Sequence, residues 1–331
     1  MERFALAAAV VLGFALTAAL CSLFVPLRRV LERREQQQQP IQSEQPRPVP
    51  LRAPLWGGLC AAAGTVAAVG VGWLAACVGQ PELLGSEGRL MTRLLTALAG
   101  SLAFGAVGLA EDLARMRSPA ALGLRRDVRL LLEALAAAFV LLLLRAAGCL
   151  PRGLGVPGAG YVLLGSAVPF LWAVLMVTLA ECARVAERDE GTVCGAAFAA
   201  MLALMMVEAG LGVSGLAVLP GALAGALVAL GLWAFPPAKL GAGCCGSLLA
   251  AGAIGCIPLS LDMTSLTVPL ALPFWAAGGL LAAQLLCAKR TGRPLRCWVK
   301  KHKMSPETVF LCSFALSAVG YVLALALLRW C

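Results

Sequence analysis

Long apolar runs of similar length set the strongest limit on how this chain can fold. Ten stretches of about 17–25 residues are nearly free of charge, which is the length that an α-helix needs to cross the hydrocarbon layer of a membrane. Because 60% of the residues are hydrophobic and 13% are charged, a soluble core could not absorb so much apolar surface. The sequence therefore predicts an all-α polytopic membrane protein, with residues 1–331 forming a single integral membrane domain. The predicted transmembrane helices are 4–26, 55–79, 91–110, 128–147, 161–183, 193–209, 215–235, 246–262, 267–288 and 308–330.

Lysine and arginine gather on one side of these predicted helices. When the connecting loops are assigned alternately to two sides, one side holds twenty basic residues and the other holds six. Cytoplasmic loops carry such an excess, so the basic side is predicted to be cytoplasmic and both termini extracytoplasmic. The net charge of +10 then reflects topology and an attraction to anionic lipid headgroups, and it indicates no nucleic-acid binding. The predicted cytoplasmic loops are 27–54, 111–127, 184–192, 236–245 and 289–307.

The third apolar run ends in two adjacent carboxylates, Glu111 and Asp112. Such a pair at the mouth of a membrane helix is costly unless it faces water, a cation or a phosphate-bearing ligand. The stretch therefore predicts the edge of a functional site, and a helix end that reaches solvent is the simpler alternative. The features that follow it are Arg115, a Gly123-Leu124 turn, Arg129 and Glu133.

The fifth run also ends in charged residues. Glu181, Arg184 and Glu187 are spaced by three, which places them on one side of a helix, where alternating charges can pair. Both a solvated, self-paired helix end and a binding site fit this pattern.

Two further segments favour a close approach of the backbone. Pro54 precedes Gly57-Gly58 at the start of the second run, and residues 235–252 combine two prolines, a lysine and four glycines before an apolar run resumes. A glycine-rich loop that leads into a helix is a common phosphate-facing arrangement, because the first N–H groups and the helix dipole favour anions. Helix punctuation is the alternative interpretation of both segments.

The remaining candidates for chemistry are few. The last predicted loop is strongly basic and contains Trp298, which suits an interface with anionic lipid, and the sole histidine is His302. The thirteen cysteines lie mostly within apolar runs, where cysteine behaves as a small apolar residue. Their spacing indicates neither a disulfide framework nor a metal site.

Taken in order, these motifs resemble a family: the phospho-N-acetylmuramoyl-pentapeptide transferases and the related polyprenyl-phosphate N-acetylhexosamine-1-phosphate transferases, of the glycosyltransferase family 4 type. The resemblance spans nearly the whole chain. The family's proline and Gly-Gly at the start of helix two match Pro54 and Gly57-Gly58, and its double aspartate falls on Glu111-Asp112. The residues beyond that pair look most like the pentapeptide-transferase branch, which carries Gly-Leu at 123–124 and Lys and Gln at the positions of Arg129 and Glu133.

Several family motifs are altered here. The signature of two asparagines and two Asp-Gly pairs falls on Glu181, Arg184, Glu187-Arg188 and Glu190-Gly191, so only the last glycine is kept. The proline-alanine loop that ends in Gly-Asp-x-Gly-Ser is matched by Pro237, Ala238, Gly243, Gly246 and Ser247, with Cys244 at the aspartate position. The family's histidine-rich segment is reduced to His302.

The resemblance implies transfer of a phospho-sugar from a uridine diphosphate donor to a polyprenyl phosphate. It also implies Mg²⁺, because a hard cation held by carboxylates would offset the repulsion between the two anionic substrates. Asp112 and Glu187 are the implied metal ligands, and the ligand at Cys244 is lost, since a thiol is a poor match for magnesium. The implied catalytic residues are Glu111, Asp112, Glu187, Glu190 and His302, and the implied substrate-binding residues are Arg115, Arg129, Glu181, Arg184, Gly243, Gly246 and Ser247.

Two functions of different classes remain open at this point. The first is a divergent transferase of peptidoglycan and cell-envelope synthesis, acting on undecaprenyl phosphate in a bacterial plasma membrane. The second is a catalytically silent paralogue that binds the lipid carrier or regulates other proteins, without Mg²⁺. A homodimer is compatible with either. A transporter is a third possibility, which the absence of charge at mid-membrane in the predicted helices disfavours.

Overall fold

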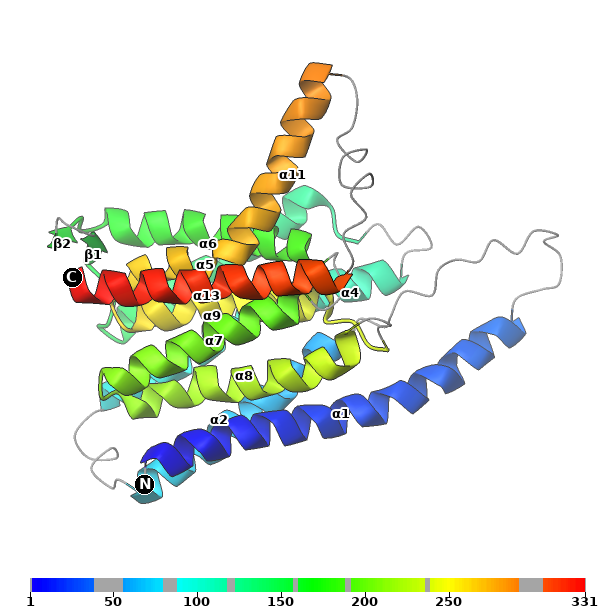
Figure 1. Ribbon diagram of the computed structural model, residues 1–331, viewed down its shortest axis with the longest axis horizontal. Coiled ribbons are helices and arrows are strands. Elements are labelled where there is room, and N and C mark those ends of the chain that lie inside the picture. The colour runs from blue at the N-terminus through cyan, green and yellow to red at the C-terminus, as the bar shows by residue number, and fades with distance from the viewer. Residues whose placement is uncertain are drawn as a thin grey trace.

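The protein is a bundle of long α-helices (Figure 1). The computed structural model describes residues 2–38, 56–79, 88–117, 123–156, 160–187, 192–235, 239–291 and 306–330. Within these ranges ten helices are 18 residues or longer, and each overlaps one of the ten predicted spans. They are α1 (Glu2–Gln38), α2 (Gly57–Gly79), α4 (Gly88–Arg117), α5 (Arg126–Ala146), α6 (Ala167–Ala186), α7 (Thr192–Gly210), α8 (Ser214–Ala234), α9 (Gly243–Ser260), α11 (Leu272–Thr291) and α13 (Pro306–Trp330).

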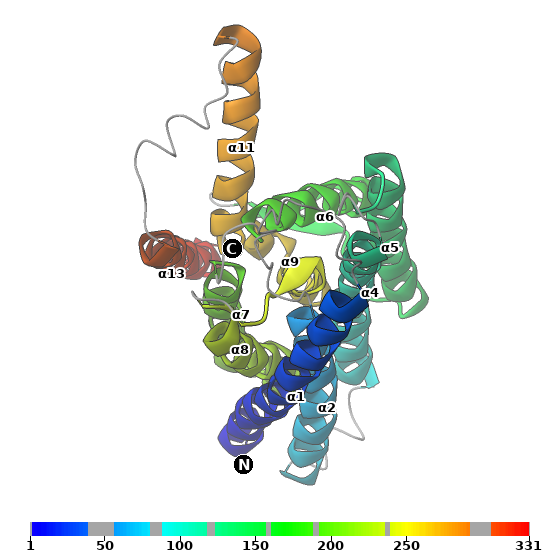
Figure 2. The same cartoon turned by 90° about the vertical axis from the view of Figure 1, so that its right-hand side faces the viewer.

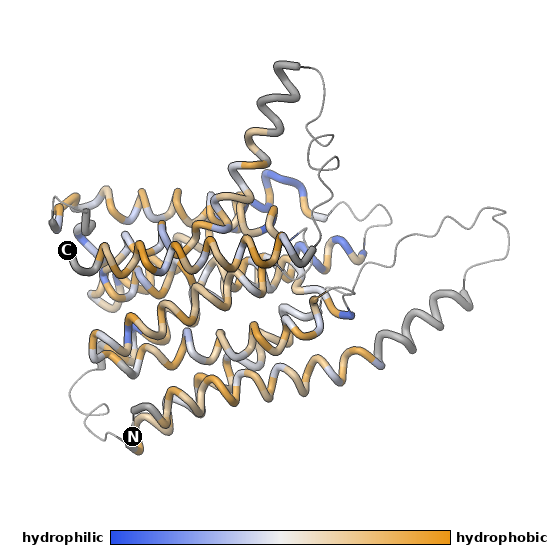
Figure 3. Tube along the Cα trace, in the orientation of Figure 1, coloured by the Kyte–Doolittle hydropathy of each residue, from blue (hydrophilic) through white to orange (hydrophobic). Residues whose placement is uncertain are grey.

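The prediction of an all-α polytopic membrane protein is confirmed. Eight helices in the described ranges are long and apolar enough to cross a membrane: α1, α2, α4, α6, α7, α8, α9 and α13. Of the other two long helices, α5 carries five charged residues, Arg126, Asp127, Arg129, Glu133 and Arg145, and α11 carries Lys289 and Arg290 near its end. Figure 3 shows the hydrophilic residues concentrated at one end of the bundle, around the start of α5.

Helix α9 forms the centre of the bundle, and all eighteen of its residues are buried. Figure 2 shows α9 surrounded by α4, α2, α7 and α6. Small residues allow the close packing: a Cβ on Gly252 would lie 3.0 Å from the Cβ of Phe104 and 3.1 Å from the Cα of Ser101 on α4. The backbones of α4 and α9 therefore run very close together, and α4 packs against α9 more extensively than any other described pair of elements.

The structure departs from the predicted elements in three places. A β-hairpin, β1 (Gly153–Val156) paired with β2 (Gly160–Leu163), precedes α6, so the span predicted from residue 161 begins at Ala167. Helix α1 continues to Gln38, into residues predicted to be loop, because the stretch is rich in helix-forming Leu, Arg, Glu and Gln. The span predicted at 267–288 is broken into α10 (Thr267–Leu270) and α11, since Pro269 and Pro273 lack the N–H group that a continuous helix requires.

The hairpin is fixed to the end of α9. Its Tyr161 hydroxyl donates a hydrogen bond to Asp262 Oδ2 at 3.0 Å. Partial burial, together with this hydrogen bond, raises the pKa of the Tyr161 phenol above its usual value. A short 3-10 turn, Thr264–Leu266, then leads into α10.

The two ends of the bundle differ in content. Helix α1 begins and α13 ends at the end that also bears the hairpin (Figure 1). Helix α4 ends, and α5, α7 and α9 begin, at the opposite end, which we call the site end. The predicted loops 111–127, 184–192 and 236–245 all connect helices at the site end, as expected if they share one side of a membrane. That this side is cytoplasmic stays a prediction.

The paired glycines at the start of α2 make the close approach that the sequence predicted. The Gly57 N–H donates to the Gly241 carbonyl at 3.2 Å, in the loop before α9. A Cβ on Gly58 would overlap the backbone of α9 at Gly246 and would lie 2.6 Å from the Ala242 carbonyl oxygen. Pro54, the third member of this motif, lies outside the described residues.

Gly58→Ala is expected to destabilise the protein by about 1–3 kcal/mol, because the added methyl group must displace backbone rather than a flexible side chain. Gly70→Ala on the same helix is the matched control, since nothing lies within 4 Å of a Cβ at that position. At this open position, replacing the helical glycine with alanine should either leave the stability of the protein unchanged or raise it by about 0.5–1 kcal/mol. Thermal unfolding in detergent measures both, and equal midpoints for the two variants would contradict the close approach.

Candidate functional site

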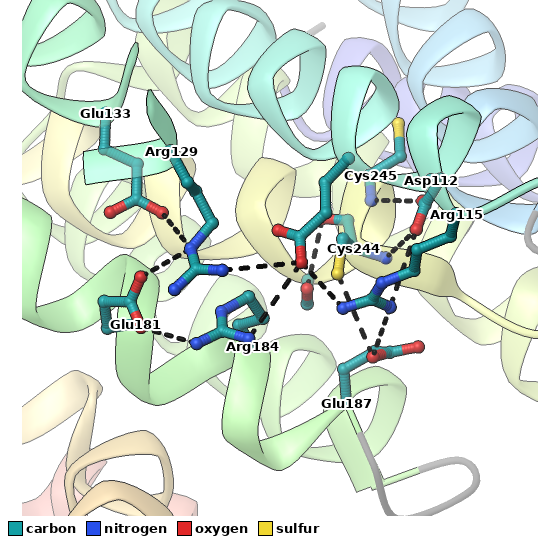
Figure 4. Close-up of polar contacts among 11 residues, drawn as sticks. Asp112, Arg115, Arg129, Glu133, Glu181, Arg184, Glu187, Cys244 and Cys245 are labelled. Carbon is teal, nitrogen blue, oxygen red and sulfur yellow. Dashed lines mark hydrogen bonds and ion pairs between the residues drawn. The ribbon is translucent and has the colours of Figure 1, made fainter. Parts of the chain in front are cut away.

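The Asp112 carboxylate binds the first N–H groups of the central helix. Asp112 lies near the end of α4 and is 1% exposed. Its Oδ1 accepts a hydrogen bond from the Cys244 N–H at 3.0 Å, and its Oδ2 accepts one from the Cys245 N–H at 2.9 Å. A negative charge at a helix N-terminus is favourable because those N–H groups lack partners within the helix and the dipole is positive there. Asp112 thus joins α4 to α9 (Figure 4).

Two glycines make this contact possible. Gly243 has φ +67°, a left-handed conformation that only glycine adopts at low cost, and it turns the chain into α9. A Cβ on Gly108, one turn before Asp112, would overlap the carbonyl of Cys244. In the described part of 235–252 the chain leads into the N-terminus of α9, where the Cys244 and Cys245 N–H groups bind a carboxylate of the same chain. That this helix start faces a phosphate stays a prediction.

Arg115 is the meeting point of three acidic residues. Its Nη2 donates to Glu111 Oε1 at 2.8 Å, and its Nη1 lies 4.0 Å from Asp112 Oδ1 and 3.7 Å from Glu187 Oε2. Glu187 lies just beyond the end of α6, so this guanidinium links α6 to α4. The Cys244 thiol also faces Glu187, with its Sγ 4.0 Å from Oε2. Glu111, Asp112 and Glu187, which the resemblance implies as catalytic residues, therefore lie together around one guanidinium.

A second group of ion pairs extends from Glu111 toward α5. Glu181 on α6 accepts hydrogen bonds from Arg129 Nε at 2.7 Å and from Arg184 Nη2 at 2.6 Å. Arg129 Nη1 is 3.7 Å and Arg184 Nη1 is 4.0 Å from Glu111 Oε1. Acidic and basic side chains therefore alternate across α4, α5 and α6. Of the alternatives raised for Glu181, Arg184 and Glu187, self-pairing is observed between Glu181 and Arg184, whereas Glu187 pairs with Arg115. That these residues form a binding site stays a prediction.

The cluster holds more acid than base. Five carboxylates share it with three guanidinium groups, so acid exceeds base by two groups. Glu133 is fully buried, its nearest cation is Arg129 Nε at 4.0 Å, and neither of its oxygens accepts a hydrogen bond. Glu111 Oε2 also lacks a partner. The carboxylates are Glu111, Asp112, Glu133, Glu181 and Glu187, and the cations are Arg115, Arg129 and Arg184.

These residues, as arranged, do not fit a magnesium ion. The Arg115 guanidinium lies within 4.0 Å of both Asp112 and Glu187, where an ion shared by those two ligands would have to lie. Both Asp112 oxygens already accept backbone hydrogen bonds. Among the described residues, no three His, Cys, Asp or Glu side chains are placed to hold a metal together.

The other predicted site residues have varied positions. The Ser247 hydroxyl donates to the Cys244 carbonyl at 3.1 Å, and Gly246 packs against Gly58, so both contribute to the structure of α9. Gly123 has φ +72°, and its turn packs against Arg115 and Glu111. Glu190 and His302 lie outside the described residues. The catalytic, substrate and metal roles given to these positions stay predictions.

Sequence reasoning missed Glu208, a carboxylate buried in the other half of the bundle. It lies within α7, is 0% exposed, and neither oxygen has a hydrogen-bond partner. The signal was present in the sequence, because Glu208 is the sole charged residue in the apolar run from Thr192 to Gly210. Glu208 lies at the end of the predicted span 193–209 and not at mid-membrane, so it does not bear on the argument against a transporter.

Comparison with known proteins bears on this cluster. The sequence model of glycosyl transferase family 4 matches residues 94–262, which is just over half of the chain. The chain belongs to glycosyl transferase family 4. This is the family of the phospho-N-acetylmuramoyl-pentapeptide transferases and related polyprenyl-phosphate hexosamine-1-phosphate transferases, so the predicted resemblance is confirmed. No curated protein matches the chain.

The matched region contains every residue of the ion-pair cluster, from Glu111 to Cys244. Family 4 membership indicates a polyprenyl-phosphate sugar-1-phosphate transferase type of function, with a polyprenyl phosphate and a nucleotide sugar as the kind of substrate. The family and the helices together indicate a multi-pass membrane protein.

Asp112→Ala is expected to destabilise this family 4 protein by about 1–3 kcal/mol, because it leaves two buried N–H groups at the start of α9 without an acceptor. Asp112→Asn should lose less stability than Asp112→Ala, since its amide oxygen can still accept a hydrogen bond from one of the two N–H groups. Asp127→Ala is the control, because Asp127 is exposed in the first turn of α5 and should contribute at most about 1 kcal/mol. Chemical unfolding in detergent measures all three, and an unchanged Asp112→Ala would refute the capping role.

Glu208→Met is expected to stabilise the protein by about 1–3 kcal/mol, because it removes a buried polar group that has no partner. Glu133→Met is the matched comparison. Glu133 is equally buried but lies near Arg129, so its loss should not stabilise. A lower thermal midpoint for Glu208→Met would show that Glu208 is satisfied by a bound group.

Proposed function

We propose that this protein is a non-transferring member of family 4, which binds a polyprenyl phosphate at the site end without magnesium and does not transfer a phospho-sugar. The observation that carries the proposal is the position of Arg115. Its guanidinium bridges Asp112 and Glu187, the two carboxylates that the resemblance assigns to the metal. Arg115 thus supplies, between these two carboxylates, the positive charge that a magnesium ion would supply in the resemblance.

The cluster's chemistry supports loss of transfer more strongly than a change of substrate. Glu111 Oε1 and both Glu181 oxygens are engaged by guanidinium groups, which disfavours proton abstraction by these carboxylates. Misplacement of reacting groups by about 1 Å can cost on the order of a hundredfold in rate. Replacement of the loop aspartate by Cys244, together with these ion pairs, changes several parts that would have to act as a unit.

The arginines at the solvent-facing edge of the cluster, and not its acid-rich interior, support binding of an anion. Arg115 and Arg184 are partly exposed at the site end, and Arg117, Arg125 and Arg126 are exposed beside them. A phosphate can form paired hydrogen bonds with a guanidinium, in place of Glu187, whose side chain is itself partly exposed. Undecaprenyl phosphate in a bacterial plasma membrane is the ligand that this proposal favours.

A working transferase of peptidoglycan synthesis is the second candidate. Family membership favours it, as does the convergence of Asp112, Glu111 and Glu187 from α4 and α6. In that case a divalent ion would have to displace the Arg115 guanidinium, and turnover would require Mg²⁺.

Exchange of labelled uridine monophosphate into a uridine diphosphate-linked sugar tests the proposal. The purified protein is incubated with Mg²⁺ and lipid-linked product, beside an active family member. We expect no exchange by this protein. Magnesium-dependent exchange that is lost in Asp112→Asn or Glu187→Gln would overturn the proposal in favour of the transferase.

Binding of polyprenyl phosphate in vesicles is measured separately, with Mg²⁺ and with a chelator. We expect equal affinity in both conditions. Arg115→Gln should weaken binding by about tenfold or more, since it removes a charged hydrogen-bond partner worth roughly 1.5–3 kcal/mol. Arg145→Gln, at the opposite end of α5, is the control. Binding that disappears with the chelator, or that Arg115→Gln does not change, would contradict a magnesium-free phosphate site.

A further inference from the structure

Glu133 lies at the inner end of the ion-pair cluster, and the function proposed above does not use it. It follows Arg129 by one turn of α5, and its side chain is 0% exposed. Neither of its oxygens has a hydrogen-bond partner among the described residues. Figure 4 shows Glu133 beside Arg129, on the side of the cluster away from Arg115 and Glu187. Its carboxyl group is thus removed from water without the hydrogen bonds that a buried charge requires.

The cation nearest to Glu133 serves another carboxylate. Arg129 Nε donates a hydrogen bond to Glu181 Oε1 at 2.7 Å, whereas its distance to Glu133 Oε1 is 4.0 Å. Arg129 Nη1 also lies 3.7 Å from Glu111 Oε1. One guanidinium therefore faces three carboxylates and is hydrogen-bonded to Glu181. A charge on Glu133 would be only partly offset, which is costly for a buried carboxylate.

The charged groups around Glu133 balance one another when Glu133 itself is neutral. Helices α4 and α6 pack against α5. The charged groups that face Glu133 are Glu111 on α4, Glu181 and Arg184 on α6, and Arg129 on α5 itself. They are two acids and two bases, so an ionised Glu133 would add an unbalanced negative charge. Surplus charge is better placed on Glu187, whose side chain is 15% exposed to water.

The resemblance to the pentapeptide-transferase branch bears on the same position, where that branch carries glutamine. Glutamine and protonated glutamic acid have nearly the same shape, and both are neutral. A proton on Glu133 therefore keeps a neutral group at this place in the cluster.

We propose that Glu133 is a proton-binding site that is occupied at neutral pH and sets the charge of the ion-pair cluster. When the proton leaves, the new carboxylate competes with Glu181 for Arg129. The added negative charge also weakens the attraction of Arg184 and Arg115 for a phosphate. Binding of polyprenyl phosphate is then weaker at high pH. This last step rests on the function proposed above, whereas occupation of the site by a proton does not.

Infrared difference spectra of the full-length protein in detergent, wild type against Glu133→Gln, test the proton site near neutral pH. A protonated carboxyl group has a C=O stretching band that a carboxylate lacks. We expect the variant to lose one such band. Asp127→Asn is the matched control, because Asp127 is exposed on the same helix and should not contribute to this band. Loss of a carboxylate band in Glu133→Gln would overturn the proposal, and Glu133→Met gives the same comparison if the amide is not tolerated.

Thermal unfolding from about pH 5 to about pH 9 gives a second measurement of the same site. The unfolded chain releases the Glu133 proton above about pH 4.3, while the folded protein keeps it to a higher pH. Folding then takes up a proton, so stability falls as the pH rises. We expect the wild-type midpoint to fall relative to that of Glu133→Gln. A wild-type midpoint that instead falls relative to the variant as the pH is lowered would show that Glu133 is charged in the folded protein.

Binding of polyprenyl phosphate in vesicles, measured over the same pH range, tests the effect on the phosphate. We expect the wild type to lose affinity at high pH by about threefold or more relative to Glu133→Gln, the scale of one added charge in a partly screened site. The variant also corrects for ionisation of the lipid phosphate itself. Equal pH dependence of the two proteins would overturn the effect on binding. Absence of binding at every pH would contradict the proposed function, and the infrared band would still decide the proton site.

Discussion

The hydrogen bonds between the Asp112 carboxylate and the start of α9 are the contact on which the site depends. Helix α9 is buried on all sides, so its first N–H groups cannot turn to water and must find an acceptor in the protein. Asp112 supplies both acceptor atoms from α4. Gly108, Gly243 and Gly58 leave room for the backbones to come this close. This carboxylate therefore has a structural role, whatever else it does.

Around this contact, the charged residues stabilise one another. Acidic and basic side chains alternate from Glu133 on α5, through Glu181 and Arg184 on α6, to Arg115 on α4. Charges this far from water are costly unless paired, and each pair here has partners within 4.0 Å. Glu181 and Arg184, at positions where the resemblance implies other residues, supply part of this pairing, whereas Glu133 lies 4.0 Å from Arg129 without a hydrogen bond. The cluster thereby holds α4, α5 and α6 together at the site end.

Much of the fold could be predicted, because hydropathy and helix length are local properties of a sequence. Each predicted span overlaps a long helix, and the glycine pair at 57–58 makes the predicted close contact. The errors occurred where local patterns compete. The hairpin at 153–163 is apolar enough to read as part of a span, and the prolines at 269 and 273 interrupt a run that hydropathy alone joins. Glu208 was overlooked because a single charge hardly lowers the average of a long apolar window.

The sequence by itself determined the class of the protein, the approximate positions of its helices and its family, since these follow from apolar length, charge distribution and motif order. Only the tertiary structure decided what the motif residues do. Asp112 and Cys244 are 132 positions apart, and no periodicity shows that one caps the other. The place of Arg115 between Asp112 and Glu187 depends in the same way on how the helices pack. Packing brings such residues together because small side chains let the helix backbones approach at particular points, and that fit is a property of the whole bundle.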